Sequence, residues 1–534
     1  MIYENSRKGH IVSAIVFVPP HEHSSDLQAS DNSQGSSVPF LLRTYNHIIL
    51  GISKSPRSQN LLFNSAVFVG FFLTVYAVYA LLSNHHKWQN MLLLIGSYVF
   101  YGWFDWRFLG LLAIITLVNF FAARSIYSGK KPPSRKLLLV SSIIANLAIL
   151  GLFKYFNFFA QNFVEALNLF GLHVDHVTLN ILLPVGLSFY MFQALGYTID
   201  VFRGKLAPTS DLFDFALFVS FFPKVVAGPI ERGANLLPQI GSQRKITAEQ
   251  IEAAIFLILW GFFKKMVIAD NLSQRITDPI FNNYAGYHGL DILIAILAFT
   301  VQIYCDFSGY TDIARGLCKL MGFNLVLNFN LPYFARNPRD FWSRWHISMS
   351  SWFRDYLYIP LGGNKKGRLA TYRNLALTML LVGLWHGAAW NFVVWGAYNG
   401  VILIIYRILG KDQESADSPG NLRPYPTVVG KVLVMFTLTF IGWTIFRSTS
   451  VDQVFYMLTN VSGAVGSNTL QFAYDLVFFS LPLVAVELLQ YFSGDMLKVT
   501  KLKSWVQIPV YSFLLIGILV LGVRGSIQFI YFRF

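Results

Sequence analysis

The chain has 534 residues, of which 54% are hydrophobic, 16% are aromatic and only 13% are charged. An ordinary soluble domain carries about 25% charged residues, so this composition and the mean hydropathy of +0.49 exclude a soluble globular enzyme. The net charge is +15, but the basic residues do not form any recognisable nucleic-acid-binding module, so we expect no nucleic acid partner. The composition predicts an all-α polytopic membrane protein.

The first sixty residues differ from the rest. Residues 1–60 are polar and rich in Ser, Asn and His, and their one apolar run, at 11–20, is too short for a signal peptide. We expect residues 1–60 to be a disordered N-terminal extension without a catalytic role. Residues 61–534 are predicted to form a single membrane domain.

Apolar runs follow one another along this domain. A helix of about 20 apolar residues spans a bilayer, and the shorter runs are expected to be re-entrant or interfacial. We therefore predict about ten to twelve crossings. The runs are 63–82, 89–104, 108–122, 137–156, 180–199, 213–228, 251–270, 290–308, 374–390, 391–408, 431–446, 473–491 and 507–523.

Basic residues gather in two places, which predicts the orientation. The segment 124–136 holds five Lys or Arg residues, and 336–373 holds eight against two Asp. The positive-inside rule places both segments in the cytoplasm, beside anionic lipid. Within the second segment, LGGNKKGR (361–368) indicates a turn with a cationic tip. Such a turn suits a phosphate-rich ligand or a lipid headgroup equally well.

Other features of the middle of the chain favour structural roles. In 181–240 the motifs PVG and AGP break helices, which is tolerated at membrane depth where the backbone is buried or lines a cavity. Asp306, Asp312 and Arg315 are expected to pair with each other or with backbone groups. Cys305 and Cys318 are the only cysteines. They are predicted to be small buried hydrophobes, and no Cys/His spacing indicates a metal site.

Two histidines are the candidate site residues. His346 lies among Arg and Trp residues in RDFWSRWHISMSSWFRDYLYIPLGG (339–363), where 343–373 indicates an amphipathic interfacial helix and loop. His386 lies inside an apolar run, in LLVGLWHGAAWNFVVWGAYNG (380–400). An ionisable side chain at membrane depth is costly and indicates function. From the residues alone, catalysis, a proton relay in a transporter and a satisfied core histidine all remain open.

Several long motifs carry a resemblance to a known family. FFPKVVAGPIERG, YCDFSGYTDIARGL, NFNLPYFARNPRDFWSRWHISMSSWFRDYLYIPLGGNKKG and LWHGAAWNFVVWG occur here in that order. They resemble the membrane-bound O-acyltransferases (MBOATs), first the bacterial alginate O-acetyltransferase (AlgI-like) group and next the D-alanyl teichoic-acid transferases. The resemblance runs from about Leu61 to Phe534. It implies the MBOAT fold, with re-entrant and interfacial helices around a central funnel, in the bacterial inner membrane.

The resemblance also implies a function. The implied function is that of an O-acetyltransferase that moves acetyl from cytoplasmic acetyl-CoA toward hydroxyls of an outer polysaccharide, such as an alginate-like polymer or peptidoglycan. Acetyl-CoA would be a co-substrate, and no permanently bound cofactor is expected. His386 would be the catalytic base, because burial favours neutral imidazole. His346 would orient the donor or stabilise the oxyanion. A separate SGNH-hydrolase-like partner is expected outside the membrane.

Some alternatives stay open. The acyl group could be D-alanyl, and the protein could be a translocation subunit that passes acetyl groups to an outer transferase, or a transporter with a histidine proton relay. The residues that bind the donor and the identity of the acceptor are not predicted.

The chain ends in FIYFRF. This ending is typical of an interfacial anchor. It is also similar to terminal aromatic-tyrosine motifs of polysaccharide acetyltransferases, which implies Tyr531 as an acyl carrier. The Tyr531 phenol is a poor nucleophile unless a base such as His386 activates it.

Overall fold

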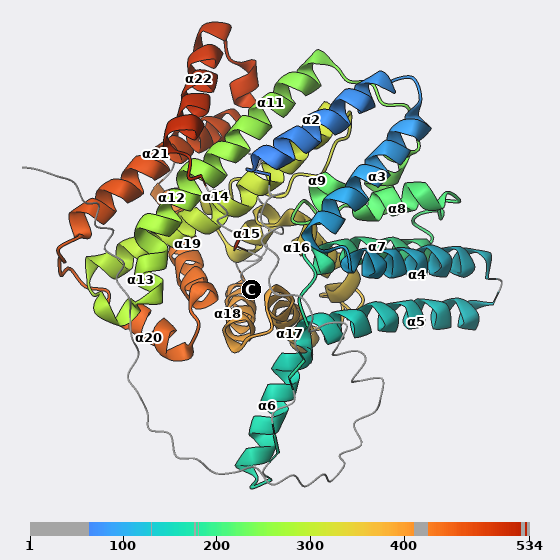
Figure 1. The fold of residues 1–534 in the computed structure, drawn as a ribbon. Helices are drawn as coiled ribbons and strands as arrows, with labels where there is room; N and C mark the ends of the chain where they lie inside the picture. Colours follow the sequence, from blue (N-terminus) through green and yellow to red (C-terminus); the bar gives the residue numbers. More distant parts are fainter. Residues whose placement is uncertain are drawn as a thin grey trace, which may run out of the picture. The chain divides into compact units, whose positions relative to one another are not determined.

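Every regular element that the structure describes is a helix (Figure 1). The computed structural model describes residues 63–129, 131–172, 174–175, 178–179, 181–410, 426–524 and 529–530, which all belong to the compact unit Pro56–Phe534. The prediction of an all-α protein is confirmed. The extension predicted for residues 1–60 lies outside the described residues and stays a prediction.

Seven described helical stretches are long and apolar enough to cross a membrane. All of them except α14 are less than half buried within the protein, which leaves their outer faces for lipid. The predicted total of about ten to twelve crossings stays a prediction, because further apolar helices such as α2 (Ala66–Leu81) are shorter. The seven stretches are α4 (Phe108–Ser128), the continuous α5–α6 region (Pro132–Leu169), α14 (Leu290–Leu320), α18 (Trp390–Ile408), α19 (Pro426–Arg447), α21 (Thr469–Ser493) and α22 (Ser504–Leu521).

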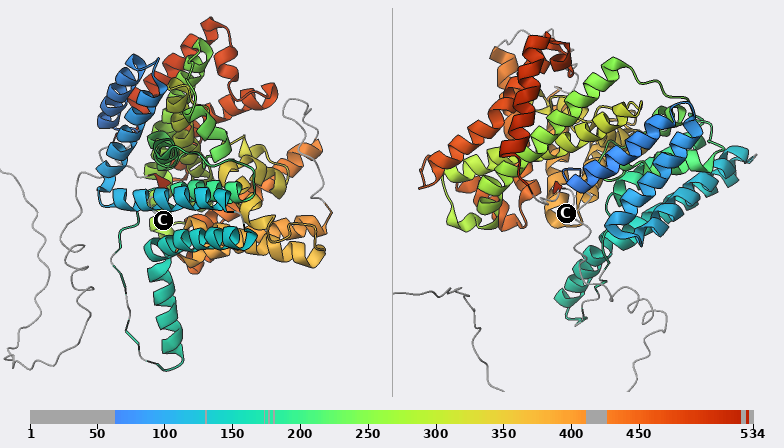
Figure 2. Two further views of the ribbon diagram at one scale, coloured as in Figure 1. Left: turned by 90° about the vertical axis from the view of Figure 1, so that its right-hand side faces the viewer. Right: turned by 45° about the horizontal axis from the view of Figure 1, so that its top comes forward.

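A group of packed helices forms the first part of the domain. Here α4, α5 and α7 (Leu187–Phe202) lie side by side, and α3 (His86–Asp105) runs at an angle to them and contacts α4 (Figures 1 and 2). Neutral hydrogen bonds join three of them: Asn119 Nδ2 donates to Asn146 Oδ1 at 3.1 Å, and Thr198 Oγ1 donates to Asn119 Oδ1 at 2.9 Å. Such bonds between membrane helices add specificity to packing that is otherwise apolar.

The helix α14 is the most buried of the seven stretches. It packs along α11 (Ala248–Phe262) through small residues. A Cβ added to Gly261 would lie 2.7 Å from the carbonyl oxygen of Gly309, so only glycine permits this approach of the two backbones. The predicted run 290–308 is the first part of this helix, which continues to Leu320.

The charged residues of α14 pair with a neighbouring segment. Lys265 Nζ lies 2.7 Å from Asp270 Oδ1 and 2.5 Å from Asp306 Oδ1, and Lys264 Nζ lies 2.6 Å from Asp312 Oδ2. Asp306 and Asp312 are thus paired, as expected for charges at this depth, but their partners here are two lysines that were not predicted. We call Lys264, Lys265, Asp270, Asp306 and Asp312 the ion-pair cluster.

Two further predictions for α14 are confirmed. Arg315 Nη1 lies 3.1 Å from Asp312 Oδ1, so this arginine extends the ion-pair cluster toward the end of the helix. Cys305 and Cys318 are buried free thiols. Their surroundings are those of small apolar side chains.

The predicted continuous span 213–228 is wrong. The structure has α8 (Leu212–Ser220) and then a separate α9 (Phe222–Val225), with a non-helical residue, Phe221 (φ −47°, ψ 113°), between them. Pro223 favours the first turn of a helix because it lacks a backbone N–H, and it starts α9 instead of continuing α8. The break is buried in protein, as expected for an interrupted helix at membrane depth.

The segment predicted to lie at the membrane interface is also different from expectation. Residues 343–373 contain the end of α15 (Pro338–Arg344) and the short α16 (Ile347–Phe353), but Trp345 and Trp352 are only 1% and 7% exposed. Trp345 packs against aromatic rings of α14 and α19 rather than against lipid. These tryptophans belong to the core.

The hairpin of α17 (Arg368–His386) and α18 is held together by glycines. A Cβ on Gly383 would lie 2.2 Å from the carbonyl oxygen of Phe392, and one on Gly396 would lie 2.4 Å from that of Met379. The close approach fixes the end of α17, where His386 lies. The other elements are α5 (Pro132–Leu150), η2 (Gly151–Tyr155), α6 (Phe156–Leu169), α10 (Gly233–Ile240), η3 (Phe263–Ala269), α12 (Asp270–Leu272), η4 (Ser273–Thr277), α13 (Asp278–Asn282), η5 (Tyr284–Gly286), η6 (Pro332–Phe334), η7 (Arg354–Tyr358), α20 (Val451–Thr459) and η9 (Lys498–Lys501).

Candidate functional site

His386 is the last residue of α17 and is 4% exposed. The helix ends there because Gly387 takes an extended conformation. The imidazole packs edge-on against the rings of Trp385, Trp395 and Phe446, with centroids 5.0 to 5.4 Å apart. An apolar aromatic wall of this kind favours a neutral imidazole.

His346 is fully buried between α15 and α16 and has a left-handed backbone, with φ 43° and ψ 54°. This conformation is uncommon for residues other than glycine and is often found at functional sites. The loop around Asn328 holds it in place. The Ile347 N–H donates to the Asn328 carbonyl at 2.9 Å, and the Ser348 N–H donates to Asn328 Oδ1 at 3.2 Å.

The two histidines meet at Trp385. Ring centroids are 5.8 Å apart for His346 and Trp385 and 5.0 Å apart for Trp385 and His386, so both imidazoles pack against the same indole. Phe307 of α14 packs edge-on against His346 at 4.7 Å. We call His346, Trp385 and His386 the histidine site. The structure thus brings together the two histidines that the sequence singled out.

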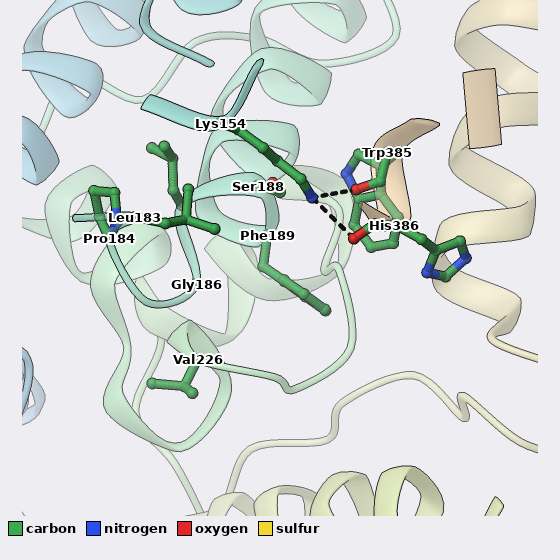
Figure 3. A pocket seen from close by; sticks show the side chains of 10 residues that line it. Lys154, Leu183, Pro184, Gly186, Ser188, Phe189, Val226, Trp385 and His386 are labelled. Atoms are coloured by element: carbon green, nitrogen blue, oxygen red, sulfur yellow. Dashed lines mark hydrogen bonds between the residues drawn. The ribbon is translucent and has the colours of Figure 1, made fainter. Parts of the chain in front are cut away.

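A lysine from a distant part of the chain lies against this site. Lys154 belongs to η2, a π-helical turn between α5 and α6. Its Nζ donates to the carbonyl oxygen of Trp385, and to that of His386 at 3.1 Å. The neighbouring Tyr155 hydroxyl donates to the Leu384 carbonyl at 2.9 Å. Figure 3 shows Lys154 reaching both carbonyl oxygens, while the imidazole of His386 points away from it.

A small cavity of about 50 Å³ lies beside Lys154. Its wall includes Ser188, at the start of α7, and Gly186, whose φ of 73° turns the chain into that helix. The predicted run 180–199 therefore becomes helical only from Leu187 on. The cavity is large enough for ordered water.

A larger cavity of about 450 Å³ lies between α15, α16, α17 and α18. Along α17 its wall includes Leu375 and Val382, about three turns and one turn before His386. Its volume is within the range of small-molecule sites. The polar part of the wall consists of Arg339, Ser343, Ser350, Ser351, Arg354, Tyr358 and Thr378.

The last described residues also reach this region. The Ile530 N–H donates to Asp306 Oδ2 at 2.8 Å. The Phe529 ring lies 5.5 Å from Phe307 and 5.0 Å from Tyr310. Since Phe307 also packs against His346, one aromatic ring separates Phe529 from the histidine site. The ion-pair cluster, through Asp306, thus holds the segment that precedes the end of the chain.

Lys154 was not predicted from the sequence. A signal for it existed, since Lys154 is the only charged residue in the apolar run 137–156, and a lone cation at membrane depth indicates a specific partner. Tyr531, the predicted acyl carrier, lies outside the described residues. In the part of the chain that the structure describes, no three His, Cys, Asp or Glu side chains are arranged to hold a metal ion.

Comparisons with known proteins agree with these features. Residues 93–438 match the model of the membrane-bound O-acyltransferase family, MBOAT. The chain is 42% identical over 398 residues to "Probable alginate O-acetylase AlgI" of Azotobacter vinelandii, covering 74% of this chain and 77% of that protein. It is 33% identical over 440 residues to "Peptidoglycan O-acetyltransferase" of Helicobacter pylori, covering 76% and 80%. It is 28% identical over 316 residues to "Teichoic acid D-alanyltransferase" of Streptococcus thermophilus, covering 54% and 75%.

Proposed function

The chain belongs to the membrane-bound O-acyltransferase family, and we propose that it transfers acetyl groups from acetyl-CoA toward the hydroxyls of a polysaccharide across the membrane. It is a multi-pass membrane protein and an O-acyltransferase. The observation that carries the finer proposal is the packing of two buried histidines on one tryptophan, at the end of a helix that lines a cavity of about 450 Å³. The relatives named for alginate and peptidoglycan acetylation support acetyl as the acyl group.

His386 acts as the general base in this proposal. It takes the proton from an acceptor hydroxyl while that oxygen attacks the thioester carbonyl carbon. The tetrahedral intermediate then collapses, the C–S bond breaks, and the proton passes from His386 to the departing CoA sulfur. The aromatic wall around His386 supports this role because it favours the neutral form that a base needs.

His346 assists at the carbonyl oxygen. Its left-handed backbone and its complete burial hold the imidazole in one orientation. A fixed donor aimed at the developing oxyanion lowers the barrier without reorganisation at the moment of reaction. His346 therefore orients the donor or stabilises the negative charge.

The cavity along α17 is the proposed entry for the donor. Its apolar wall suits the pantetheine arm and the acetyl group, while Arg339 and Arg354 suit the phosphates of CoA. The helix α17 starts at Arg368, directly after the cationic LGGNKKGR turn that the positive-inside rule assigns to the cytoplasm. A donor entering from the cytoplasmic side of the inner membrane would meet the cavity before it reaches His386.

Tyr531 is proposed as an intermediate carrier of the acetyl group. Ile530, the residue before it, is fixed by Asp306, and Phe529 lies one ring away from His346. In this step the phenol proton passes to His386 while the phenol oxygen attacks the acetyl carbonyl carbon; the C–S bond then breaks, and the proton passes from His386 to the departing CoA sulfur. A separate SGNH-type transferase outside the membrane then moves acetyl from the tyrosine ester to the polysaccharide.

The test uses membrane vesicles that hold the full chain together with the outer transferase and the acceptor polymer, and acetyl-labelled CoA is supplied on the cytoplasmic face. We expect label in exopolysaccharide or wall polymer from the wild type. In His386→Ala we expect a loss of roughly 10²–10⁴-fold, the usual contribution of a general base, with unchanged abundance in the membrane. His288→Ala is the matched control, because His288 is an exposed histidine in a loop, and it should retain full activity.

The same assay separates the alternatives. Acetylation that persists in His386→Ala, or transport of a solute without acyl-CoA, would contradict the proposal and favour a transporter. Label transferred from a D-alanyl thioester but not from acetyl-CoA would reassign the acyl group. For the carrier step, an acetyl adduct on Tyr531 by peptide mass analysis is expected, and full activity of Tyr531→Phe would exclude it.

A further inference from the structure

The last turn of α17 is capped from another part of the molecule. The final carbonyls of an α-helix have no partner within the helix. Here the carbonyls of Leu384, Trp385 and His386 accept hydrogen bonds from Tyr155 and Lys154, residues that lie about 230 positions earlier in the chain. The helix end that carries the proposed base is therefore held by the α5–α6 region.

The cap comes from an irregular turn. The segment Gly151–Tyr155 is π-helical, whereas α5 before it and α6 after it are α-helical. A π-helical turn changes the direction of the side chains, and such turns are frequent at functional sites. In both figures of the fold, α6 leaves α5 at a steep angle (Figures 1 and 2). The turn thus allows two consecutive side chains to reach the end of α17.

The charge of Lys154 suits this position. A cation at a helix C-terminus interacts favourably with the helix dipole. Among the residues that the structure describes, no carboxylate forms an ion pair with Lys154, and its described hydrogen bonds go to the two carbonyl oxygens. In the ion-pair cluster, by contrast, each lysine contacts at least one aspartate.

The geometry also limits what Lys154 does. Its ammonium contacts the backbone of His386, and the imidazole points away from it (Figure 3). The imidazole packs against Trp395 and Phe446. Lys154 therefore does not exchange a proton with the ring. It acts through the backbone that determines where the ring lies.

We propose that Lys154 is a positioning residue, which caps α17 across the fold and thereby sets the imidazole of His386 for proton transfer. This inference rests on the proposed acyl transfer at His386. A displacement of about 1 Å in a reacting group is enough to lower a rate by about 10²-fold. Loss of the cap should therefore slow the chemical step more than it weakens donor binding.

The test compares Lys154→Met, Lys154→Arg and Tyr155→Phe in the full chain. For Lys154→Met we expect a kcat about 10- to 100-fold lower, with the KM for acetyl-CoA within about twofold and normal abundance. Lys154→Arg keeps donors for the two carbonyls and should recover most of the kcat. Tyr155→Phe removes only the bond to Leu384, so a smaller decrease is expected. Lys205→Met, which alters an exposed lysine, is the control and should resemble the wild type.

A second measurement does not depend on activity. Hydrogen–deuterium exchange should become at least about fivefold faster in Lys154→Met for peptides covering 380–390, and should not change for peptides covering the start of α17. A kcat of Lys154→Met equal to the wild type, or no recovery by Lys154→Arg, would overturn the inference. If the wild type transfers no acetyl but exchange at 380–390 still responds, the cap stands and the proposed function fails. Unchanged exchange would exclude the cap.

Discussion

The ion-pair cluster and the histidine site meet on α14 and are built in opposite ways. In the cluster, Lys264 and Lys265 contact aspartates at 2.5 to 2.7 Å. In the histidine site, the described neighbours of the imidazoles are aromatic rings. Two adjacent residues of α14 belong to different regions: Asp306 is part of the ion-pair cluster, and Phe307 packs against His346 of the histidine site.

The difference teaches how ionisable groups at membrane depth divide between structure and chemistry. A buried charge that meets its opposite charge cannot easily change its protonation state, so it fixes helices in place. An imidazole packed among aromatic rings loses hydration, and this loss favours the neutral form that can accept a proton. The comparison therefore predicts that mutations in the ion-pair cluster alter stability, whereas mutations in the histidine site alter rate.

The largest effect on stability is expected for Lys265→Met. The change leaves Asp270 and Asp306 as buried carboxylates without their shared cation, and breaking a buried pair in this way costs about 3–5 kcal/mol. The thermal unfolding midpoint of the purified protein should fall steeply. Lys245→Met, at an exposed position, is the matched control. An unchanged midpoint for Lys265→Met would contradict the structural role of the cluster.

The comparison also explains how much of the fold was predictable from the sequence. Apolar runs predicted most helices, because a membrane helix needs about 20 apolar residues whatever it contacts. That Asp306 and Asp312 are paired was predictable, since charges at that depth require partners, and so was the Arg315–Asp312 contact; their lysine partners were not predicted. The break at Phe221 was not predicted, because the run 213–228 is mostly apolar, with Asp214 and Lys224 its only charged residues, and Pro223 is also compatible with the first turn of a helix.

The site was predictable in its residues but not in its geometry. His346 and His386 stand out in sequence, yet their common contact with Trp385 depends on the path of a loop and a helix between them. The burial of Trp345 was missed because a mixture of Trp and Arg is also typical of a membrane interface. Lys154 was missed because its partners are backbone carbonyls about 230 residues away. Every residue has a backbone carbonyl, so the sequence does not show which ones accept this hydrogen bond.

An intermediate effect is expected for Gly383→Ala. The added Cβ would lie 2.2 Å from the carbonyl oxygen of Phe392, so α17 and α18 must move apart. Overpacking of this kind costs about 1–3 kcal/mol, and the shift should also lower the kcat, since His386 follows three residues later. Gly430→Ala is the control, because a Cβ there meets no atom within 4 Å. A variant that loses stability but keeps the full kcat would show that the hairpin does not position the base.

The smallest effect is expected where the buried contact that is removed joins two neutral side chains. Thr198→Val removes the hydrogen bond to Asn119 Oδ1 at 2.9 Å while keeping the shape of the side chain. Hydrogen bonds between membrane helices contribute about 0.6 kcal/mol on average, so the unfolding midpoint should fall only slightly and the kcat should not change. A double-mutant cycle with Asn119→Ala isolates this coupling. A coupling as large as the cost of Lys265→Met would mean that neutral polar contacts hold this fold as firmly as its ion pairs, and the contrast between charged and neutral buried groups would then fail.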